Sequence, residues 1–241
     1  MDRTRKLVER LAVALDVPTG KEAVELAKRL SGVVGVLKCG LELFCAEGPS
    51  IVVELQKHAP VFLDLKLHDI PTTVNRALNA VLPLDPLLIN IHALGGPDMM
   101  RAASEAVGLH RQKGGRTLLL SVTVLTSLDR AALEKMGIMT EPGGMALGLA
   151  RLAKGAGCDG VVCSALESPS IRAECGVGFA RLTPGVRPKG SGTQDQARVV
   201  TPGEAVAAGA DWVVVGRPIT HSPDPAAAAE AILAEMAEAG A

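Results

Sequence analysis

The sequence predicts an α/β protein, a single (β/α)8 TIM barrel that takes in residues 1–241 as one domain. Three observations predict this fold. Apolar runs alternate with longer helical patterns along the chain, these runs number eight, and the length of 241 residues is close to the ~250 that such a barrel typically needs. No change of composition and no long linker divides the chain, so we expect one domain.

The predicted strands are short and mostly rich in leucine or β-branched residues, with few polar residues inside. Such runs are typical of parallel strands that are covered on both faces. The eight strands are expected at Leu11–Val17, Gly35–Gly40, Val61–Leu67, Leu87–Ala93, Thr117–Thr126, Gly160–Ala165, Ala180–Val186 and Trp212–Gly216.

The helices between these strands carry start and stop signals. Thr19 and Thr201 are each followed three residues later by glutamate, which fits a capping box, and Pro202 suits the first position of a helix. An open doubly wound sheet is the structural alternative, but it would normally bring a glycine fingerprint after the first strand, and residues 16–20 do not match one. Glycines stand where helices should end, at Gly32, Gly114, Gly115, Gly155 and Gly209.

The composition argues against several classes of function. The 25 basic and 26 acidic residues nearly cancel and aromatic residues make up only 2%, so we expect no nucleic-acid or membrane partner. The five cysteines are odd in number and match no zinc or disulfide spacing, which favours a reducing, cytoplasmic location. The charged N-terminus precedes only a short apolar run, so neither a signal peptide nor a membrane span is expected.

Polar residues gather toward the C-terminal ends of the predicted strands, where barrels of this fold carry their active sites. We therefore expect these strand ends to form the mouth of a functional site. They contribute Asp16, Lys38, Asp64, Lys66, Asn90, His92, Thr123, Thr126, Ser164, Thr183, Gly216 and Arg217.

The third strand carries the strongest signal. Alternation places Val61, Leu63, Leu65 and Leu67 on one face and Phe62, Asp64, Lys66 and His68 on the other, so that an acid and a base are roughly 6–7 Å apart along one face. Ile70-Pro71 then ends the strand, with Asp69 at the bend. Taken alone, this stretch is also compatible with a surface strand that carries a salt bridge.

Lys38, Asp64, Lys66 and Asp69 would bring two positive and two negative charges to one site. Alternating signs allow these groups to share a poorly solvated space, and the array suits stabilisation of a developing negative charge with an ammonium as proton source. Metal binding is a competing use of the carboxylates, but the interleaved lysines already neutralise them. A Schiff-base lysine needs a depressed pKa, whereas flanking carboxylates act in the opposite direction.

The last two strands predict a phosphate site. Barrels of this fold often bind phosphate with the loops after strands seven and eight, where Arg187 and Arg217 could form bidentate bonds and Gly216 allows close approach of the backbone. Residues 188–197 are rich in glycine and polar residues, which is typical of a mobile lid as well as of an idle loop. The two arginines favour the lid.

Other residues fit structural roles better. His58, His110 and His221 are expected at the surface or in capping roles, and His92 as a structural hydrogen-bonding residue. The cysteines are expected to be small buried residues. The alanine-rich run 226–239 predicts an amphipathic helix that closes the barrel.

The run from Asp64 to Val74, DLKLHDIPTTV, resembles the signature of orotidine 5′-phosphate decarboxylase. The resemblance covers nearly the whole chain, and the His-Asp-Ile-Pro-Thr-Thr and Pro-Gly-Val-Arg segments are its most specific parts. One departure is the run from Pro83 to Pro86, which replaces a shorter glycine-containing turn. Further matching segments are Ala14–Asp16, Leu37–Gly40, Val124–Ser127, Thr183–Arg187, Asp195-Gln196 with Arg198, and Val215–Thr220.

This resemblance implies decarboxylation of orotidine 5′-phosphate to UMP, with Lys66 as proton donor to C6 of the pyrimidine and Asp64, Lys38 and Asp69 beside it. It implies no cofactor and no metal. It also implies a homodimer with sites at the interface, in which Asp69 and Thr73 reach into the partner's site. The remaining implied contacts are ribose with Asp16 and Lys38, pyrimidine with Thr126, base and phosphate with Gln196, and phosphate with Arg187, Gly216 and Arg217.

Two other functions stay open at this point. A phosphosugar enzyme of the same fold, either a keto-acid sugar phosphate decarboxylase or a hexulose phosphate synthase, would be expected to need Mg²⁺ and further acidic ligands at other strand ends. Outside the third strand only Asp16 offers one. A non-catalytic nucleotide-binding barrel would not need an acid that faces an anionic ligand.

Overall fold

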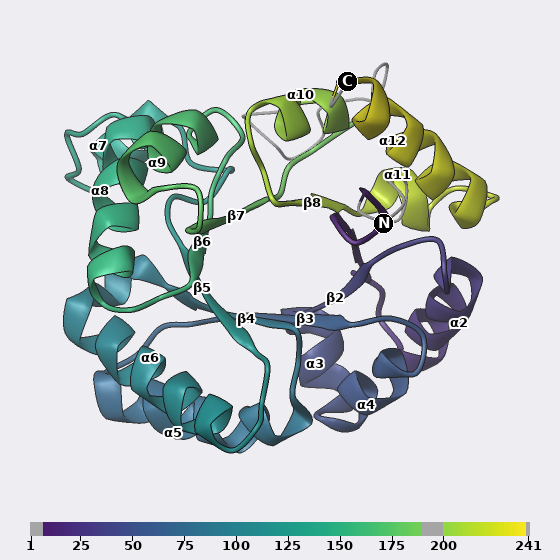
Figure 1. Ribbon diagram of the computed structural model, residues 1–241, viewed down its shortest axis with the longest axis horizontal. Coiled ribbons are helices and arrows are strands. Elements are labelled where there is room, and N and C mark those ends of the chain that lie inside the picture. Colours follow the sequence, from purple (N-terminus) through teal and green to yellow (C-terminus); the bar gives the residue numbers. More distant parts are fainter. Residues whose placement is uncertain (1–6, 189–199, 240–241) are drawn as a thin grey trace.

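Eight parallel strands close into a barrel in sequence order, with β8 paired to β1, as the alternating pattern predicts (Figure 1). The computed structural model describes residues 7–188 and 200–239. The strands are β1 (Leu11–Ala14), β2 (Val36–Gly40), β3 (Val61–Leu67), β4 (Leu88–His92), β5 (Leu118–Val122), β6 (Gly160–Val162), β7 (Ala180–Thr183) and β8 (Trp212–Val215).

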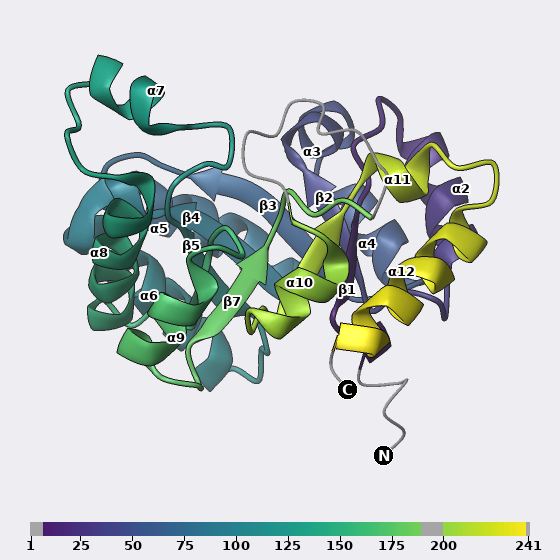
Figure 2. The same cartoon turned by 90° about the horizontal axis from the view of Figure 1, so that it is seen from above.

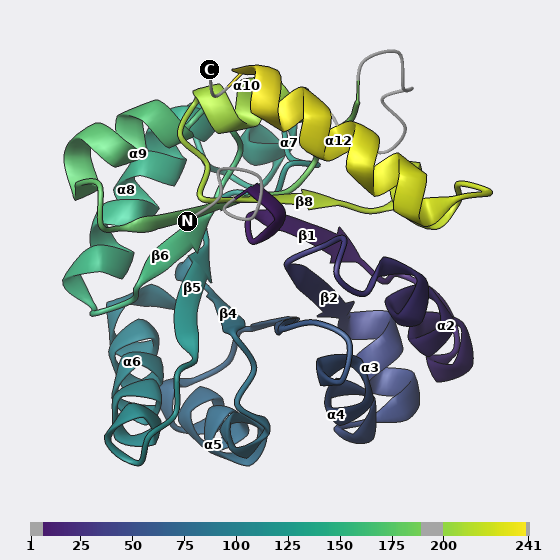
Figure 3. The ribbon, with the colours of Figure 1, turned by 45° about the vertical axis from the view of Figure 1, so that its right-hand side comes forward.

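Helices surround the barrel on its outer side in every view (Figures 1–3). The C-terminal helix, α12 (Pro225–Ala239), packs against α10 (Pro202–Ala207), α11 (Arg217–Thr220) and α2 (Gly20–Leu30), and so covers the junction of the last and first strands. The helices are α2 (Gly20–Leu30), α3 (Leu41–Glu47), α4 (Ser50–Gln56), α5 (Pro71–Val81), α6 (Gly96–Gln112), α7 (Arg130–Lys135), α8 (Pro142–Gly155), α9 (Ser168–Cys175), α10 (Pro202–Ala207), α11 (Arg217–Thr220) and α12 (Pro225–Ala239), with short 3-10 turns at Leu82–Leu84 and Ala93–Gly95.

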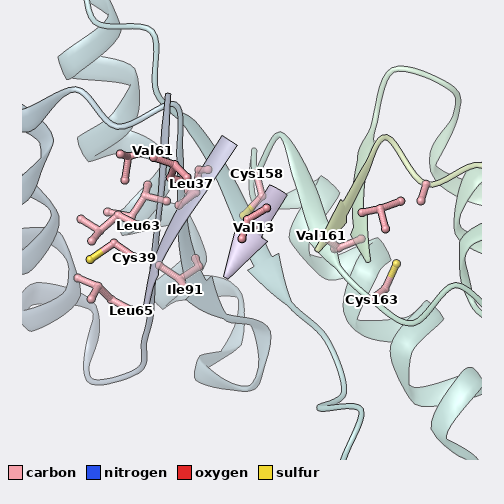
Figure 4. Packing of buried hydrophobic residues seen from close by; sticks show 14 of the residues in the cluster. Val13, Leu37, Cys39, Val61, Leu63, Leu65, Ile91, Cys158, Val161 and Cys163 are labelled. Atoms are coloured by element: carbon pink, nitrogen blue, oxygen red, sulfur yellow. The ribbon is translucent and has the colours of Figure 1, made fainter. Parts of the chain in front are cut away.

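Strand register separates the apolar residues into two layers. Even-numbered residues pair with even-numbered residues around the barrel and point into it, where Phe62, Leu88 and Leu120 belong to the inner cluster. Odd-numbered residues such as Val13, Leu37 and Leu63 lie between the strands and the helices (Figure 4). The predicted alternation along β3 is therefore confirmed for Val61 to Leu65.

Several strands are shorter than predicted at their C-terminal ends. The ladder of β1 stops at Ala14 and not Val17, that of β5 at Val122 and not Thr126, and that of β7 at Thr183 and not Val186. The residues beyond remain largely apolar and divide into two groups. Leu15 and Val186 are fully buried in the core, whereas the residues that line the cavity are Asp16, Val124, Leu125, Thr126, Pro184 and Gly185. A run of apolar residues therefore predicts burial better than it predicts pairing.

The predicted caps are present. Thr201 forms a complete capping box with Glu204, whereas the Thr19 hydroxyl accepts one bond, at 3.3 Å, from the backbone N–H of Glu22. Gly32 and Gly209 adopt positive φ just beyond α2 and α10, which is the left-handed conformation expected after a helix end.

At Pro83–Pro86, where the sequence departs from the family that it resembles, Asp85 takes the place of the expected glycine. Asp85 adopts the left-handed conformation (φ 47°) that glycine would otherwise provide, which aspartate tolerates better than most residues. Its Oδ1 accepts hydrogen bonds from the backbone N–H of Arg116 at 2.9 Å and from Nε2 of His110 at 2.8 Å. His110 thus has a half-buried structural role, rather than the surface or capping role expected of it.

Candidate active site

The end of β3 departs from regular strand geometry where its charged residues lie. Leu63 pairs with Ile89 and Leu67 with Ile91, so β3 has two more residues than β4 between these pairs. Within this bulge Lys66 adopts φ 49°, which is uncommon for a residue other than glycine and costs about 1–3 kcal/mol. The sequence did not predict this backbone conformation, and bulges of this kind often re-aim side chains next to active sites.

The charged side chains form one continuous chain of contacts. Lys66 Nζ lies 2.7 Å from Oδ1 of Asp64, and Lys38 Nζ lies 3.4 Å from Oδ2 of the same carboxylate. Lys38 also donates to Oδ1 of Asp16 at 2.8 Å. The structure therefore brings together three strand ends, those of β1, β2 and β3, in an alternating array of two carboxylates and two ammonium groups.

Burial makes this array strongly coupled. Burial alone would raise the pKa of Asp64, but Lys38 and Lys66 outweigh this effect, and the pKa is lowered. Likewise, burial alone would lower the pKa of Lys38, but Asp64 and Asp16 reverse the direction, and the pKa is raised. Both groups are thus held in their charged forms in a site where Asp64 is only 6% exposed.

A cavity of about 580 Å³ opens above this array, within the usual range for small-molecule sites. Its walls are partly apolar, with Phe62, Val122 and Leu182 from the inner layer below. Of the residues predicted for the site, those that line the cavity are Asp16, Lys38, Asp64, Lys66, Thr126, Arg187, Gly216 and Arg217.

The side of the cavity formed by the last two strands is basic. Arg187 is 7% exposed and donates from Nη1 to the carbonyl of Val186 at 2.9 Å, while Arg217 begins α11 directly after Gly216. Guanidinium groups that line a cavity suit an anion there, because their planar N–H donors match the oxygens of a phosphate or carboxylate. The two arginines and the array of β1–β3 residues line the same cavity.

Three predicted residues are not part of this cavity as described. Asp69 and Thr73 are exposed, and the Asp69 carboxylate accepts from the backbone N–H of Ile70 at 2.6 Å. Gln196 lies outside the described residues, as do Asp195, Arg198 and most of the predicted lid. The flanks of that segment meet in a parallel bridge between Val186 and Val200.

Not every polar strand end faces the mouth. Thr123 and Thr183 have odd positions and point away from the barrel interior, and the Thr123 hydroxyl donates to the carbonyl of Val162 at 3.0 Å. His92 is buried against His68, with ring centroids 5.4 Å apart, and its Nδ1 accepts from the backbone N–H of Leu94. Burial, together with His68 and Lys66, lowers the pKa of His92 to about 4, which agrees with the structural role expected of it.

Sequence reasoning gave no role to Gly40, which the geometry requires. A Cβ atom at this position would lie 2.9 Å from Lys38 Nζ and 3.0 Å from Asp16 Oδ1, so glycine leaves the space in which this pair forms. The signal was present in the sequence, because Gly40 lies two residues after Lys38 at the end of a predicted strand.

Fold and site together define a class, a (β/α)8-barrel protein with a charged cavity at the C-terminal mouth of the barrel, where enzymes of this fold carry their active sites. Residues 9–232 match the family model described as Orotidine 5'-phosphate decarboxylase / HUMPS family. The chain belongs to this family.

Curated relatives are similar over almost the full chain. The orotidine 5′-phosphate decarboxylase of Halorhodospira halophila is 51% identical over 96% of this chain and 97% of its own length. The protein of the same name from Anaeromyxobacter sp. (strain K) is 51% identical over 95% of this chain and 98% of its own.

Solved structures agree with the fold. The orotidine 5′-phosphate decarboxylase from Lactobacillus acidophilus is 35% identical and covers 94% of this chain and 98% of its own, with a TM-score of 0.81. An uncharacterized conserved protein from Geobacillus kaustophilus is 37% identical, with the same TM-score, and covers 94% of this chain and 99% of its own. Within residues 7–188 and 200–239, no helix has both the length and the apolar character needed to cross a membrane.

Proposed function

We propose that this protein converts orotidine 5′-phosphate to UMP and CO2, a step of pyrimidine biosynthesis, without a cofactor. The observation that carries the proposal is the alternating array Asp16–Lys38–Asp64–Lys66 in one cavity with two arginines. The family and its curated relatives support it. An acid held in its charged form next to an anionic substrate is hard to explain by binding alone.

The substrate would lie across the cavity with its phosphate at Arg187, Gly216 and Arg217. Its ribose hydroxyls would meet Asp16 and Lys38, which already contact each other at 2.8 Å. The pyrimidine would then extend over the end of β3, with Thr126 beside the ring. We further propose that Gln196, which lies outside the described residues, contacts both the base and the phosphate.

The reaction breaks the bond from C6 to the carboxylate and leaves the electron pair on C6. Lys66 would stabilise this developing negative charge and transfer a proton from Nζ to C6, which completes UMP. Asp64, hydrogen-bonded to Nζ at 2.7 Å, fixes the position of this ammonium group. The departing carboxylate would lie next to Asp64, and we attribute the acceleration to stabilisation of the carbanion-like transition state by Lys66 rather than to repulsion of the substrate by Asp64.

A metal is not needed in this scheme. Each carboxylate of the array that faces the cavity is already in contact with an ammonium group, which neutralises the charge that a divalent cation would require. In the part of the chain that the structure describes, no three His, Cys, Asp or Glu side chains gather as metal ligands do.

The assay is the loss of absorbance as orotidine 5′-phosphate becomes UMP, measured with EDTA present. We expect full turnover under these conditions. Absence of turnover, or turnover that depends on added Mg²⁺, would contradict the proposal, and the second result would favour a phosphosugar enzyme of the same family.

Two variants separate chemistry from binding. Lys66→Ala should abolish turnover while the protein stays folded and binds UMP, because it removes the proton donor; substantial residual activity would exclude Lys66 from that role. Arg217→Ala should chiefly raise KM, because it removes a phosphate contact. An unchanged KM would show that the phosphate lies elsewhere.

We also propose a cytoplasmic homodimer whose sites lie at the interface, with no nucleic-acid or membrane partner. Asp69 and Thr73 are exposed beside Ile70, which is 66% exposed, as expected of residues that contact a second subunit. Mixing inactive Lys66→Ala and Asp69→Ala proteins should restore part of the activity, since one of the two sites in each mixed dimer would be intact. If the mixture stays inactive, the sites are not shared.

A further inference from the structure

Asn90 is a buried polar residue that lies beneath the charged array and outside the cavity lining. It belongs to β4, is 0% exposed, and follows Leu88 by two residues, so that both side chains lie on the inner face of the barrel. It contacts both members of the Asp64–Lys66 pair. Its Nδ2 donates to Oδ1 of Asp64 at 2.6 Å, and its Oδ1 accepts from the backbone N–H of Lys66 at 2.7 Å.

The chemistry of these partners fixes the orientation of the amide. The backbone N–H of Lys66 can only donate, so the oxygen of Asn90 must face it. The charged carboxylate of Asp64 can only accept, so the nitrogen must face Asp64. An asparagine fits both partners at once, whereas an aspartate would bring two carboxylates together and a leucine would satisfy neither.

The contact with Lys66 also replaces a missing backbone partner. Two extra residues of β3 lie between the pairs Leu63–Ile89 and Leu67–Ile91, so the regular ladder is interrupted at Lys66. A buried N–H without a partner costs about 1–3 kcal/mol, and the left-handed backbone of Lys66 adds a cost of similar size. The side chain of Asn90 therefore holds a backbone conformation that would otherwise be unfavourable.

We propose that Asn90 is a positioning residue for the decarboxylation, because it holds the bulge of Lys66 and one oxygen of Asp64 in a single fixed geometry. This inference rests on the proposed function. Asn90 does not touch the substrate, so its effect reaches the reaction only through Lys66 and Asp64. A misplacement of about 1 Å in a catalytic group can cost on the order of 100-fold in rate.

The first test compares Asn90→Leu, which removes both hydrogen bonds at similar volume, with Thr123→Val as a matched control. Thr123 is also 0% exposed and loses one buried hydrogen bond, to the carbonyl of Val162, but it does not contact the array. UMP titration gives the number of binding-competent sites and the Kd, and kcat is then expressed per site. We expect kcat of Asn90→Leu to fall roughly 10- to 100-fold with the Kd for UMP within about threefold, and Thr123→Val to keep its kcat within about threefold.

The second variant, Asn90→Asp, keeps the acceptor for the Lys66 N–H but places a carboxyl against Asp64, with Lys66 and Lys38 as the other charged groups nearby. Two carboxylates this close cannot both ionise, so a shared proton should preserve the geometry at lower pH. Its kcat relative to the native enzyme should therefore decrease as the pH is raised. A purely structural role predicts that the fraction of UMP-binding sites changes with pH while kcat per site does not.

Hydrogen exchange at the backbone amide of Lys66 reports on the geometry of the bulge independently of catalytic activity. This amide should exchange slowly in the native protein and much faster in Asn90→Leu. Native kcat per site in Asn90→Leu, or a Lys66 amide that remains protected in that variant, would overturn the inference. If the native protein does not turn over orotidine 5′-phosphate but the exchange result holds, the proposed function fails while the positioning of Lys66 by Asn90 stands.

Discussion

Replacing Gly40 with alanine should damage the site while leaving the fold intact. The new Cβ would lie 2.9 Å from Lys38 Nζ and 3.0 Å from Asp16 Oδ1, whereas ordinary contacts begin near 3.4 Å. The backbone at Gly40 has φ −89°, which alanine adopts without strain, so only the two side-chain ends must move. A shift of several tenths of an ångström in each partner weakens the 2.8 Å contact between them and moves Lys38 relative to Asp64.

We expect Gly40→Ala to lower kcat/KM by roughly 10- to 100-fold, equivalent to about 1.4–2.7 kcal/mol of lost transition-state stabilisation. The assay is steady-state decarboxylation of orotidine 5′-phosphate, combined with thermal unfolding. Gly108→Ala is the matched control, because a Cβ there meets no atom within 4 Å and α6 should gain about 0.5–1 kcal/mol in helix propensity with no change in activity. A Gly40→Ala enzyme with native kcat/KM would refute the argument that this glycine makes room for the pair.

Three further predictions concern groups outside the reaction. Asp85→Ala should lower the free energy of unfolding by about 2–3 kcal/mol in urea titrations, because alanine is strained at φ 47° and the hydrogen bonds from Arg116 and His110 are lost. Partial burial would raise the pKa of Asp85, but these hydrogen bonds lower it on balance. As the pH is lowered from about 4 through this lowered pKa, the free energy of unfolding of the native protein should therefore decrease more steeply than that of Asp85→Asn. Equal dependence of the two free energies on pH would contradict the assignment. His92, with its pKa lowered to about 4, should stay neutral with its proton on Nε2 in NMR titrations between pH 5.5 and 8, and an imidazolium signal in that range would be inconsistent with its burial. Cys45 is the exposed cysteine and the other four are buried, so one thiol per chain should react rapidly in the native protein and five in denaturant.

The sequence predicted the barrel because its signals are local and repeat eight times. Periodicity, caps and glycines each depend on nearby residues, and the alternation along β3 correctly separated Phe62 and Asp64 from Leu63 and Leu65. The ends of strands were less predictable. Leu15 and Val124 follow the last strand residues of β1 and β5 and are still buried, and hydropathy does not distinguish burial in a strand from burial just beyond it.

Eight of the residues predicted for the site line one cavity, because the strand ends of a closed barrel converge, whereas their roles in a reaction stay predictions. What the sequence left out depends on contacts between strands. Asn90 was noted only as a polar strand end, since its two partners lie on β3 and depend on the bulge there. The position of Gly40 two residues after Lys38 was visible in the sequence, but the space that it leaves for the contact between Lys38 and Asp16 depends on the ends of two different strands. Whether Asp69 and Thr73 serve a second subunit stays a prediction.

The bulge in β3 also restricts how this chain can vary in length. Between the pairs Leu63–Ile89 and Leu67–Ile91, β3 contains two residues more than β4. Because two is an even number, Leu67 still lies on the same face of the strand as Leu63. An insertion or deletion of one residue before Asp64 would exchange the two faces of the strand and turn its carboxylate toward the helices. Changes of length in this strand can therefore preserve the active site only in steps of two, whereas the loops at either end of the strand are free of this constraint.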